Sequence, residues 1–191
     1  AVWRGNPKNN VYKEVGDPTE IAFLYALENI SQAKSKKELE QKYPRLFSLP
    51  FDSDRKLMSS INKINDETIV IVKGAPDVLI NKCINLSPKE TNELKTKIQE
   101  WSNASYRVLM IAIKKITSSN MNELKVLKNH ELYNLVENKL DFIGLVAMID
   151  PPRETSKESI RLCLNAGIKP IMITGDNINT AISIAKELGI Y

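Results

Sequence analysis

Three strand-length apolar segments follow one another closely in the first half of the chain, at residues 45–51, 57–64 and 68–73. The short polar break Asn65-Asp66-Glu67 separates the second from the third and predicts a hairpin. Two further strand candidates lie at residues 107–114 and 139–147. Helices and strands mix without strict βαβ alternation, which favours an antiparallel sheet flanked by helices.

Three helix starts carry capping signals. Asp17-Pro18-Thr19-Glu20 has a capping residue, a proline at the first helical position and a glutamate at the third. Apolar residues at helical spacing follow it. Ser35-Lys36-Lys37-Glu38 and Ser87-Pro88-Lys89-Glu90 repeat the capping-box pattern and predict two more helices.

The pattern changes after Asp150. Two prolines lead into a predicted helix over residues 156–165, then a strand over 168–174, a turn and a last helix ended by Gly189. This order is typical of one step of a parallel, doubly wound sheet. About 40 residues cannot bury a core unaided. We therefore predict one complete domain over residues 1–149 and a fragment of a second over residues 150–191, which we expect to contribute little to stability.

Composition excludes several classes of protein. The chain has no run of about 18 apolar residues, and Ala1–Asn10 lacks the apolar core of a signal peptide, so we expect the chain by itself to be soluble. Two separated cysteines, Cys83 and Cys163, and one histidine make a metal site improbable, and we predict none. The net charge of +4 is spread among acidic residues, so we expect no nucleic-acid partner.

Two segments carry residues suited to an anionic or aromatic ligand. In Lys73-Gly74-Ala75-Pro76-Asp77, an ammonium and a helix start follow a strand, where phosphate can meet N–H groups. A turn with a solvated lysine is the alternative. In the segment from Pro50 to Lys56, Phe51 can stack on a base and Lys56 can reach an anion. A core phenylalanine followed by a polar turn is the alternative there.

A third segment, Thr174-Gly175-Asp176, follows a predicted strand of the doubly wound type, where such sheets bind ligands. Asp176 capping the next helix is the simpler interpretation, and Glu20 likewise can merely complete its capping box. The phosphate-binding GxxxxGK[ST] loop does not occur in the chain.

Taken in order, six segments resemble the P-type cation-transporting ATPases, and most closely the calcium-pump-like type II branch. They are Gly16-Asp17-Pro18-Thr19-Glu20, Pro50-Phe51-Asp52-Ser53-Asp54-Arg55-Lys56, Lys73-Gly74-Ala75-Pro76-Asp77, Tyr106-Arg107-Val108-Leu109, Asp150-Pro151-Pro152-Arg153 and Thr174-Gly175-Asp176-Asn177. The match spans nearly the whole chain. It implies the family's nucleotide-binding domain, followed by part of its haloacid-dehalogenase-like phosphorylation domain.

The resemblance implies a role for each matching residue. Phe51 would stack on adenine, Glu20 would contact the adenine edge, Lys73 would lie deep in the pocket, and Gly74 would allow close approach of the ligand. Lys56 and Arg107 would help to hold the phosphates. The residues that would form the hinge between domains are Asp150, Pro151, Pro152 and Arg153, and those that would surround the γ-phosphate are Thr174, Gly175 and Asp176.

The resemblance also implies the setting: a cytoplasmic part of an integral membrane protein that uses ATP with Mg²⁺ to transport a cation, with Ca²⁺ favoured. The membrane, actuator and phosphorylation domains of the same polypeptide would be its partners. Two departures stand out. Ser53 occupies a position where many relatives carry a basic residue, and the sequence contains neither the phosphorylated DKTGT segment nor GDGxNDxP.

We therefore expect residues 1–191 to bind ATP and ADP but to lack catalytic residues. A free-standing nucleotide-binding module is the main alternative, which transmembrane segments and DKTGT in the same gene would eliminate. A small phosphatase of the haloacid-dehalogenase type is less consistent with the sequence, because a DxDx nucleophile motif is missing.

Overall fold

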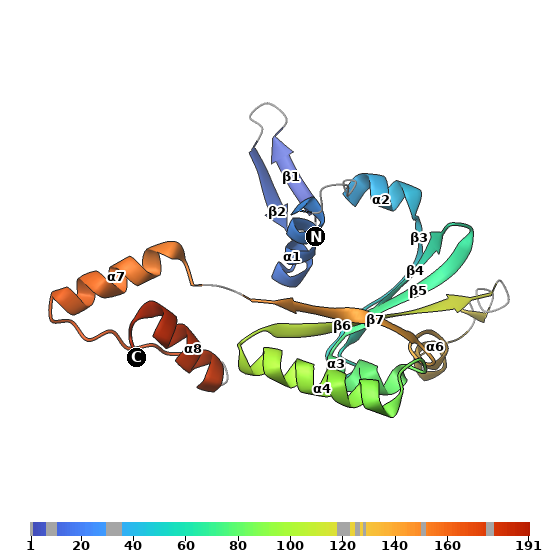
Figure 1. The fold of residues 1–191 in the computed structure, drawn as a ribbon. Coiled ribbons are helices and arrows are strands. Elements are labelled where there is room, and N and C mark those ends of the chain that lie inside the picture. Colours follow the sequence, from blue (N-terminus) through green and yellow to red (C-terminus); the bar gives the residue numbers. More distant parts are fainter. Residues whose placement is uncertain are drawn as a thin grey trace. The chain divides into compact units, whose positions relative to one another are not determined.

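The computed structural model describes residues 2–6, 11–29, 36–117, 123–124, 127, 129–149, 152–174 and 178–191 (Figure 1). Its strands are β1 (Val2–Asn6), β2 (Val11–Val15), β3 (Arg45–Asp52), β4 (Leu57–Ile64), β5 (Glu67–Gly74), β6 (Arg107–Ile116) and β7 (Asp141–Met148). Its helices are α1 (Pro18–Asn29), α2 (Lys36–Lys42), α3 (Pro76–Leu79), the 3-10 turn η1 (Ile80–Lys82), α4 (Pro88–Asn103), α6 (Asn129–Val136), α7 (Glu154–Asn165) and α8 (Ile178–Leu188).

Five strands form one sheet in the order β3-β4-β5-β6-β7, so each strand lies beside its neighbour in the sequence. β6 and β7 pair antiparallel, with Arg107 opposite Met148. Between β4 and β5, Asn65 and Asp66 both have positive φ, as a two-residue hairpin turn requires. The predicted antiparallel sheet flanked by helices and the predicted hairpin are confirmed, with strand ends moved by one or two residues.

Contacts within the chain divide it into two units, and the first consists of Ala1–Pro50, Ser59–Ile71 and Lys114–Val136. β1 and β2 form an antiparallel hairpin in it, with Val2 opposite Val15, and this hairpin was not predicted from the sequence. α1 begins where its capping signal predicted, because Oδ1 of Asp17 accepts a hydrogen bond from the Thr19 amide at 2.8 Å. α2 begins at Lys36, but the predicted cap, Ser35, lies outside the described residues.

The second unit consists of Phe51–Met58, Val72–Ile113 and Glu137–Tyr191. α4 begins with the predicted capping box: the Ser87 hydroxyl accepts from the Glu90 amide, and the Glu90 carboxylate accepts from the Ser87 amide at 2.8 Å. Alternate residues of β6 are buried, as expected of a strand with one face on a core. The fully buried side chains of this unit include Leu57, Leu79, Met110 and Leu140.

The last forty residues of the second unit hold two helices and no strand among those described. α7 and α8 each end at a glycine of positive φ, Gly167 (+76°) and Gly189 (+78°), as predicted. The predicted strand over 168–174 is wrong: these residues join no sheet, and Ile173 is 93% exposed. A strand exists only through hydrogen bonds to a neighbour, and no described segment supplies one. The doubly wound sheet stays a prediction, as does the domain boundary at residue 150.

Candidate functional site

The turn between β3 and β4 is tightly organised by Asp52. Its Oδ1 atom accepts hydrogen bonds from the amides of Asp54 at 2.9 Å and Arg55 at 3.0 Å, and its carbonyl accepts from the Lys56 amide at 2.7 Å. The Arg55 amide is the main cause that holds the pKa of Asp52 below its usual value. Just before this turn, Phe51 is 63% exposed, so its ring is open to a ligand rather than part of the core.

The β4–β5 hairpin brings this turn to the end of β5. In an antiparallel hairpin the start of the first strand lies beside the end of the second, and the Ala75 amide accordingly donates to the Lys56 carbonyl at 3.0 Å. A Cβ atom on Gly74 would lie 2.4 Å from the Lys56 carbonyl oxygen and 2.5 Å from Cδ2 of Leu57. Glycine at this position therefore has a packing reason, besides the ligand approach that the resemblance implies.

Lys56 itself has a left-handed backbone, with φ of 55°. Its Nζ atom lies 3.3 Å from Oδ2 of Asp77, and both side chains are more than half exposed. An ion pair in so much water is worth little, on the order of 0–1 kcal/mol, so an incoming anion can compete for the ammonium. Lys73 is half-buried on β5, directly before Gly74. The hairpin thus joins two segments, which we call the turn 51–56 and the segment 73–77. The first holds Phe51 and Lys56, and the second holds Lys73 and Gly74.

The other predicted site residues lie outside the turn 51–56 and the segment 73–77. Arg107 is exposed at the start of β6, within the second unit. Glu20 lies in the first turn of α1, which belongs to the first unit, whereas the turn 51–56 belongs to the second. Thr174 is exposed, and Arg153 precedes α7 in an extended conformation after the half-buried Pro152. Asp150, Pro151, Gly175 and Asp176 lie outside the described residues.

A family model described as "P-type ATPase, cytoplasmic domain N" matches residues 1–155. The chain belongs to this family. It is 41% identical over 178 residues to a "Probable cation-transporting P-type ATPase" of Mycoplasma genitalium, covering 93% of this chain and 19% of that protein. It is 44% identical over 185 residues to "Calcium-transporting ATPase 1" of Lactococcus lactis, covering 92% and 20%. The chain thus spans about a fifth of the length of the curated relatives it matches.

Two acidic residues that pair with the turn 51–56 were not predicted from the sequence. Asp77 pairs with Lys56, as described above. Glu137 forms an ion pair with Arg55, and its side chain is 2% exposed. Arg55 lies inside one of the segments that resemble the family, but no local pattern marks Glu137, because its partner lies 82 residues away.

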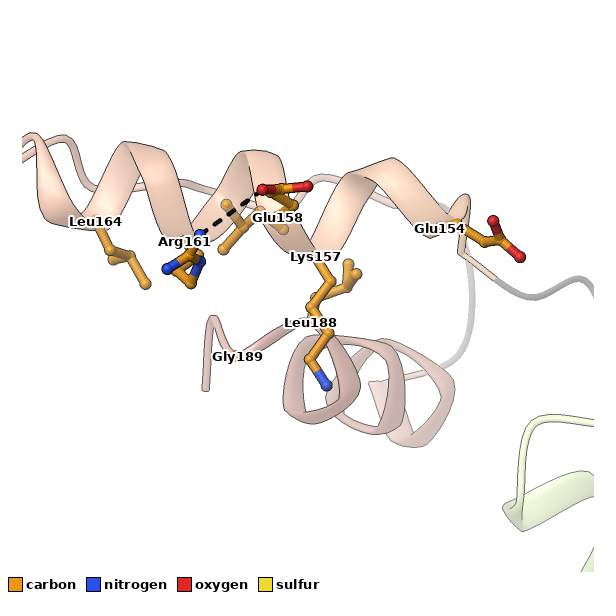
Figure 2. Close-up of a pocket in the computed structure, with 8 residues that line it drawn as sticks. Glu154, Lys157, Glu158, Arg161, Leu164, Leu188 and Gly189 are labelled. Atoms are coloured by element: carbon orange, nitrogen blue, oxygen red, sulfur yellow. Dashed lines mark ion pairs between the residues drawn. The ribbon is translucent and has the colours of Figure 1, made fainter.

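A hollow of about 530 Å³ lies between α7 and the end of α8. Figure 2 shows Lys157 and Arg161 of α7 beside Leu188 and Gly189, and Arg161 pairs with Glu158 at 3.7 Å. None of the predicted nucleotide-binding residues lines it.

Within the described ranges, no group of three acidic, histidine or cysteine side chains could hold a metal ion, and no helix is long and apolar enough to cross a membrane. Both cysteines are free.

Proposed function

We propose that this chain is the ATP-binding part of a P-type ATPase that couples ATP hydrolysis, through an aspartyl phosphate, to cation transport. Membership of the domain N family supports the setting. The observation that carries nucleotide binding is the joining of the turn 51–56 to the segment 73–77 by the hydrogen bond from Ala75 to the Lys56 carbonyl. It sets an exposed aromatic ring and two ammonium groups on adjoining segments, a combination suited to a base and its phosphates.

Each residue has a role in this proposal. Phe51 stacks on adenine, and Lys56 leaves Asp77 to pair with phosphate. Lys73 contacts both the adenine and the phosphates of ATP. Arg107 adds positive charge near the phosphates, and Glu20 contacts the adenine edge.

The remaining predicted residues act between domains. Thr174, Gly175 and Asp176 would surround the γ-phosphate, and Asp150, Pro151, Pro152 and Arg153 would form the hinge. The partners are the membrane, actuator and phosphorylation domains of the same polypeptide. The names of several relatives favour Ca²⁺ as the transported cation.

Mg²⁺ would accompany the bound ATP and would supply charge neutralisation at its phosphates. This chain's own side chains bind and orient the nucleotide. Because the sequence lacks DKTGT, residues 1–191 alone should form no phosphoenzyme. Incubation with γ-labelled ATP followed by an acid gel checks this, and a labelled band at the mass of the chain would contradict it.

Titration calorimetry of the 191-residue chain with ATP, ADP and adenosine tests the binding site. Phe51→Ala should weaken all three by about 1–3 kcal/mol, the usual contribution of one base on one aromatic ring. Lys56→Asn, which tolerates the left-handed backbone, should weaken ATP and ADP and reduce the salt dependence of binding. Lys73→Ala should affect ATP more than adenosine without sparing adenosine.

Leu46→Ala is the matched control for Phe51→Ala, because Leu46 is a 46% exposed apolar residue on the same strand. It should leave all three affinities unchanged. If Phe51→Ala folds normally and binds adenosine as tightly as the unmodified chain, the stacking role is wrong.

A further inference from the structure

The ion pair between Arg55 and Glu137 is the most deeply buried pair of opposite charges in the described part of the chain. The Arg55 side chain is 16% exposed and that of Glu137 is 2% exposed. Nη1 of Arg55 donates to Oε1 of Glu137. The other ion pairs of the described residues have both side chains at least about a third exposed. The pair between Arg55 and Glu137 is therefore shielded from solvent, whereas the other described ion pairs are open to it.

Glu137 belongs to a segment that is itself held in place. It follows the last residue of α6, and the next residue, Asn138, accepts a hydrogen bond from Nζ of Lys82 at 3.0 Å. The Leu140 amide donates to the Lys82 carbonyl at 2.9 Å, and the Ile84 amide donates to the Leu140 carbonyl at 2.8 Å. These hydrogen bonds fix residues 137–140 to the end of η1. The position of Glu137, whose carboxylate accepts the hydrogen bond from Arg55, is therefore restrained as well.

Arg55 directly precedes Lys56 in the turn 51–56, whose other attachment is to the segment 73–77. The Lys56 carbonyl receives the Ala75 amide, and α3 and η1 lead from there to Lys82. The contacts close a ring: from Arg55 to Glu137, through residues 138–140 to Lys82, back along η1 and α3 to Ala75, and across to Lys56. Every member of this ring belongs to the second unit.

Burying an ion pair costs desolvation free energy of several kcal/mol per ion, so such a pair is poor evidence for added stability. In some proteins, buried polar or charged groups instead fix one arrangement among several, because an unpaired buried charge makes the alternatives costly. Here, the pair joins the turn 51–56 to the segment that follows α6.

We propose that Arg55 and Glu137 are positioning residues for nucleotide binding, which hold the turn 51–56 so that Phe51 and Lys56 are already placed when ATP arrives. The inference rests on the proposed function. Neither residue needs to touch the nucleotide. Fixing the turn beforehand lowers the ordering cost that binding would otherwise carry, which is about 0.5–1.5 kcal/mol for each immobilised side chain.

Glu137→Gln is the test, because glutamine keeps the shape and an acceptor oxygen but removes the charge. ATP affinity, measured by calorimetry on the 191-residue chain, should fall about tenfold if two side chains lose their preorganisation. A second readout follows the turn directly: in the unliganded chain, the pKa of the Asp52 carboxyl, measured by NMR, should rise toward its usual 3.8. That shift is expected because the Arg55 amide no longer stays in place to hold the carboxylate.

Val136→Ala is the matched control. Val136 is 1% exposed and directly precedes Glu137, so its truncation destabilises the same region without removing the ion pair. Even if Val136→Ala lowers the melting temperature as much as Glu137→Gln does, it should leave the ATP affinity and the Asp52 pKa unchanged. Should Glu137→Gln fail to fold, Arg55→Lys keeps the charge, loses the planar guanidinium, and should shift both readouts in the same direction by less.

The outcomes separate the two ideas. If the unmodified chain binds ATP and Glu137→Gln binds it within twofold, the positioning role is wrong and the proposed function stands. Equal weakening by Val136→Ala would likewise overturn it, because general destabilisation would then explain the effect. If the unmodified chain binds no ATP, the proposed function fails and the inference fails with it, whatever the Asp52 pKa does.

Discussion

Gly74→Ala is the substitution whose effect the structure defines most closely. The added Cβ would lie 2.4 Å from the Lys56 carbonyl oxygen and 2.5 Å from Cδ2 of Leu57. Leu57 is 1% exposed, so its side chain has no open space to enter. Gly74 is not among the described glycines with positive φ, so the cost is steric rather than a matter of backbone conformation.

The size of the effect follows from two contributions. Overpacking a well-filled site costs about 1–3 kcal/mol, and moving the Lys56 carbonyl away weakens its hydrogen bond from Ala75, worth about 1 kcal/mol. A total of about 3 kcal/mol corresponds to a fall in melting temperature of roughly 6–12 °C for a chain of this size.

Gly144→Ala provides the control within the same sheet. A Cβ atom there would meet nothing within 4 Å, and Gly144 also lies in a strand. Alanine should leave the melting temperature unchanged or raise it slightly, because glycine in a strand costs about 0.5–1 kcal/mol relative to alanine. Both variants are compared by thermal unfolding without nucleotide, which isolates packing from ligand approach. If Gly74→Ala melts within about 1 °C of the unmodified chain, the Lys56 carbonyl and Leu57 do not oppose an added methyl group, and the reasoning is refuted.

Three further predictions concern α4 and the chain's last residues. Ser87→Ala should destabilise the chain by about 1 kcal/mol in chemical denaturation, the usual cost of losing a helix cap; Ser102→Ala, at the other end of α4, is the control, and equal losses would refute a specific capping effect. The Ser87 hydroxyl chiefly causes the lowered pKa of Glu90, so the capping box should stabilise the chain above the usual pKa of 4.5 and lose that contribution as the pH falls below it. A chain ending at residue 149 should unfold cooperatively near the same temperature as the full chain, since α7 has no buried residue and Ala185 is the one buried residue described in α8; a large loss of stability would contradict the proposed domain boundary.

Local patterns predicted most of the fold. The strands around residues 57–64 and 68–73 and the turn at Asn65 were predictable because apolar segments and a two-residue turn are encoded over a few positions. The same is true of the Ser87 capping box. The segment 168–174 misled the prediction because its apolar residues specify a strand only where a neighbouring strand pairs with them.

The site was predictable in part. The proximity of Lys56 to Gly74 follows from the hairpin alone, so the motif and the strand pattern suffice. The partners of the basic residues were not predictable: Glu137 meets Arg55 only through packing between segments 82 residues apart. The packing role of Gly74 also needed the structure, because the sequence does not reveal that a carbonyl oxygen occupies the place of its missing Cβ.

The wide separation of Arg55 and Glu137 has a consequence for the order of folding. β3, β4 and β5 are joined by short turns and end at Gly74, so they can pair early. The partner of Arg55 lies 82 residues along the chain, and closing so long a loop is slower. We expect the turn 51–56 to take its final form after the transition state. Glu137→Gln should then speed unfolding and leave the refolding rate nearly unchanged, which stopped-flow measurements in denaturant would reveal.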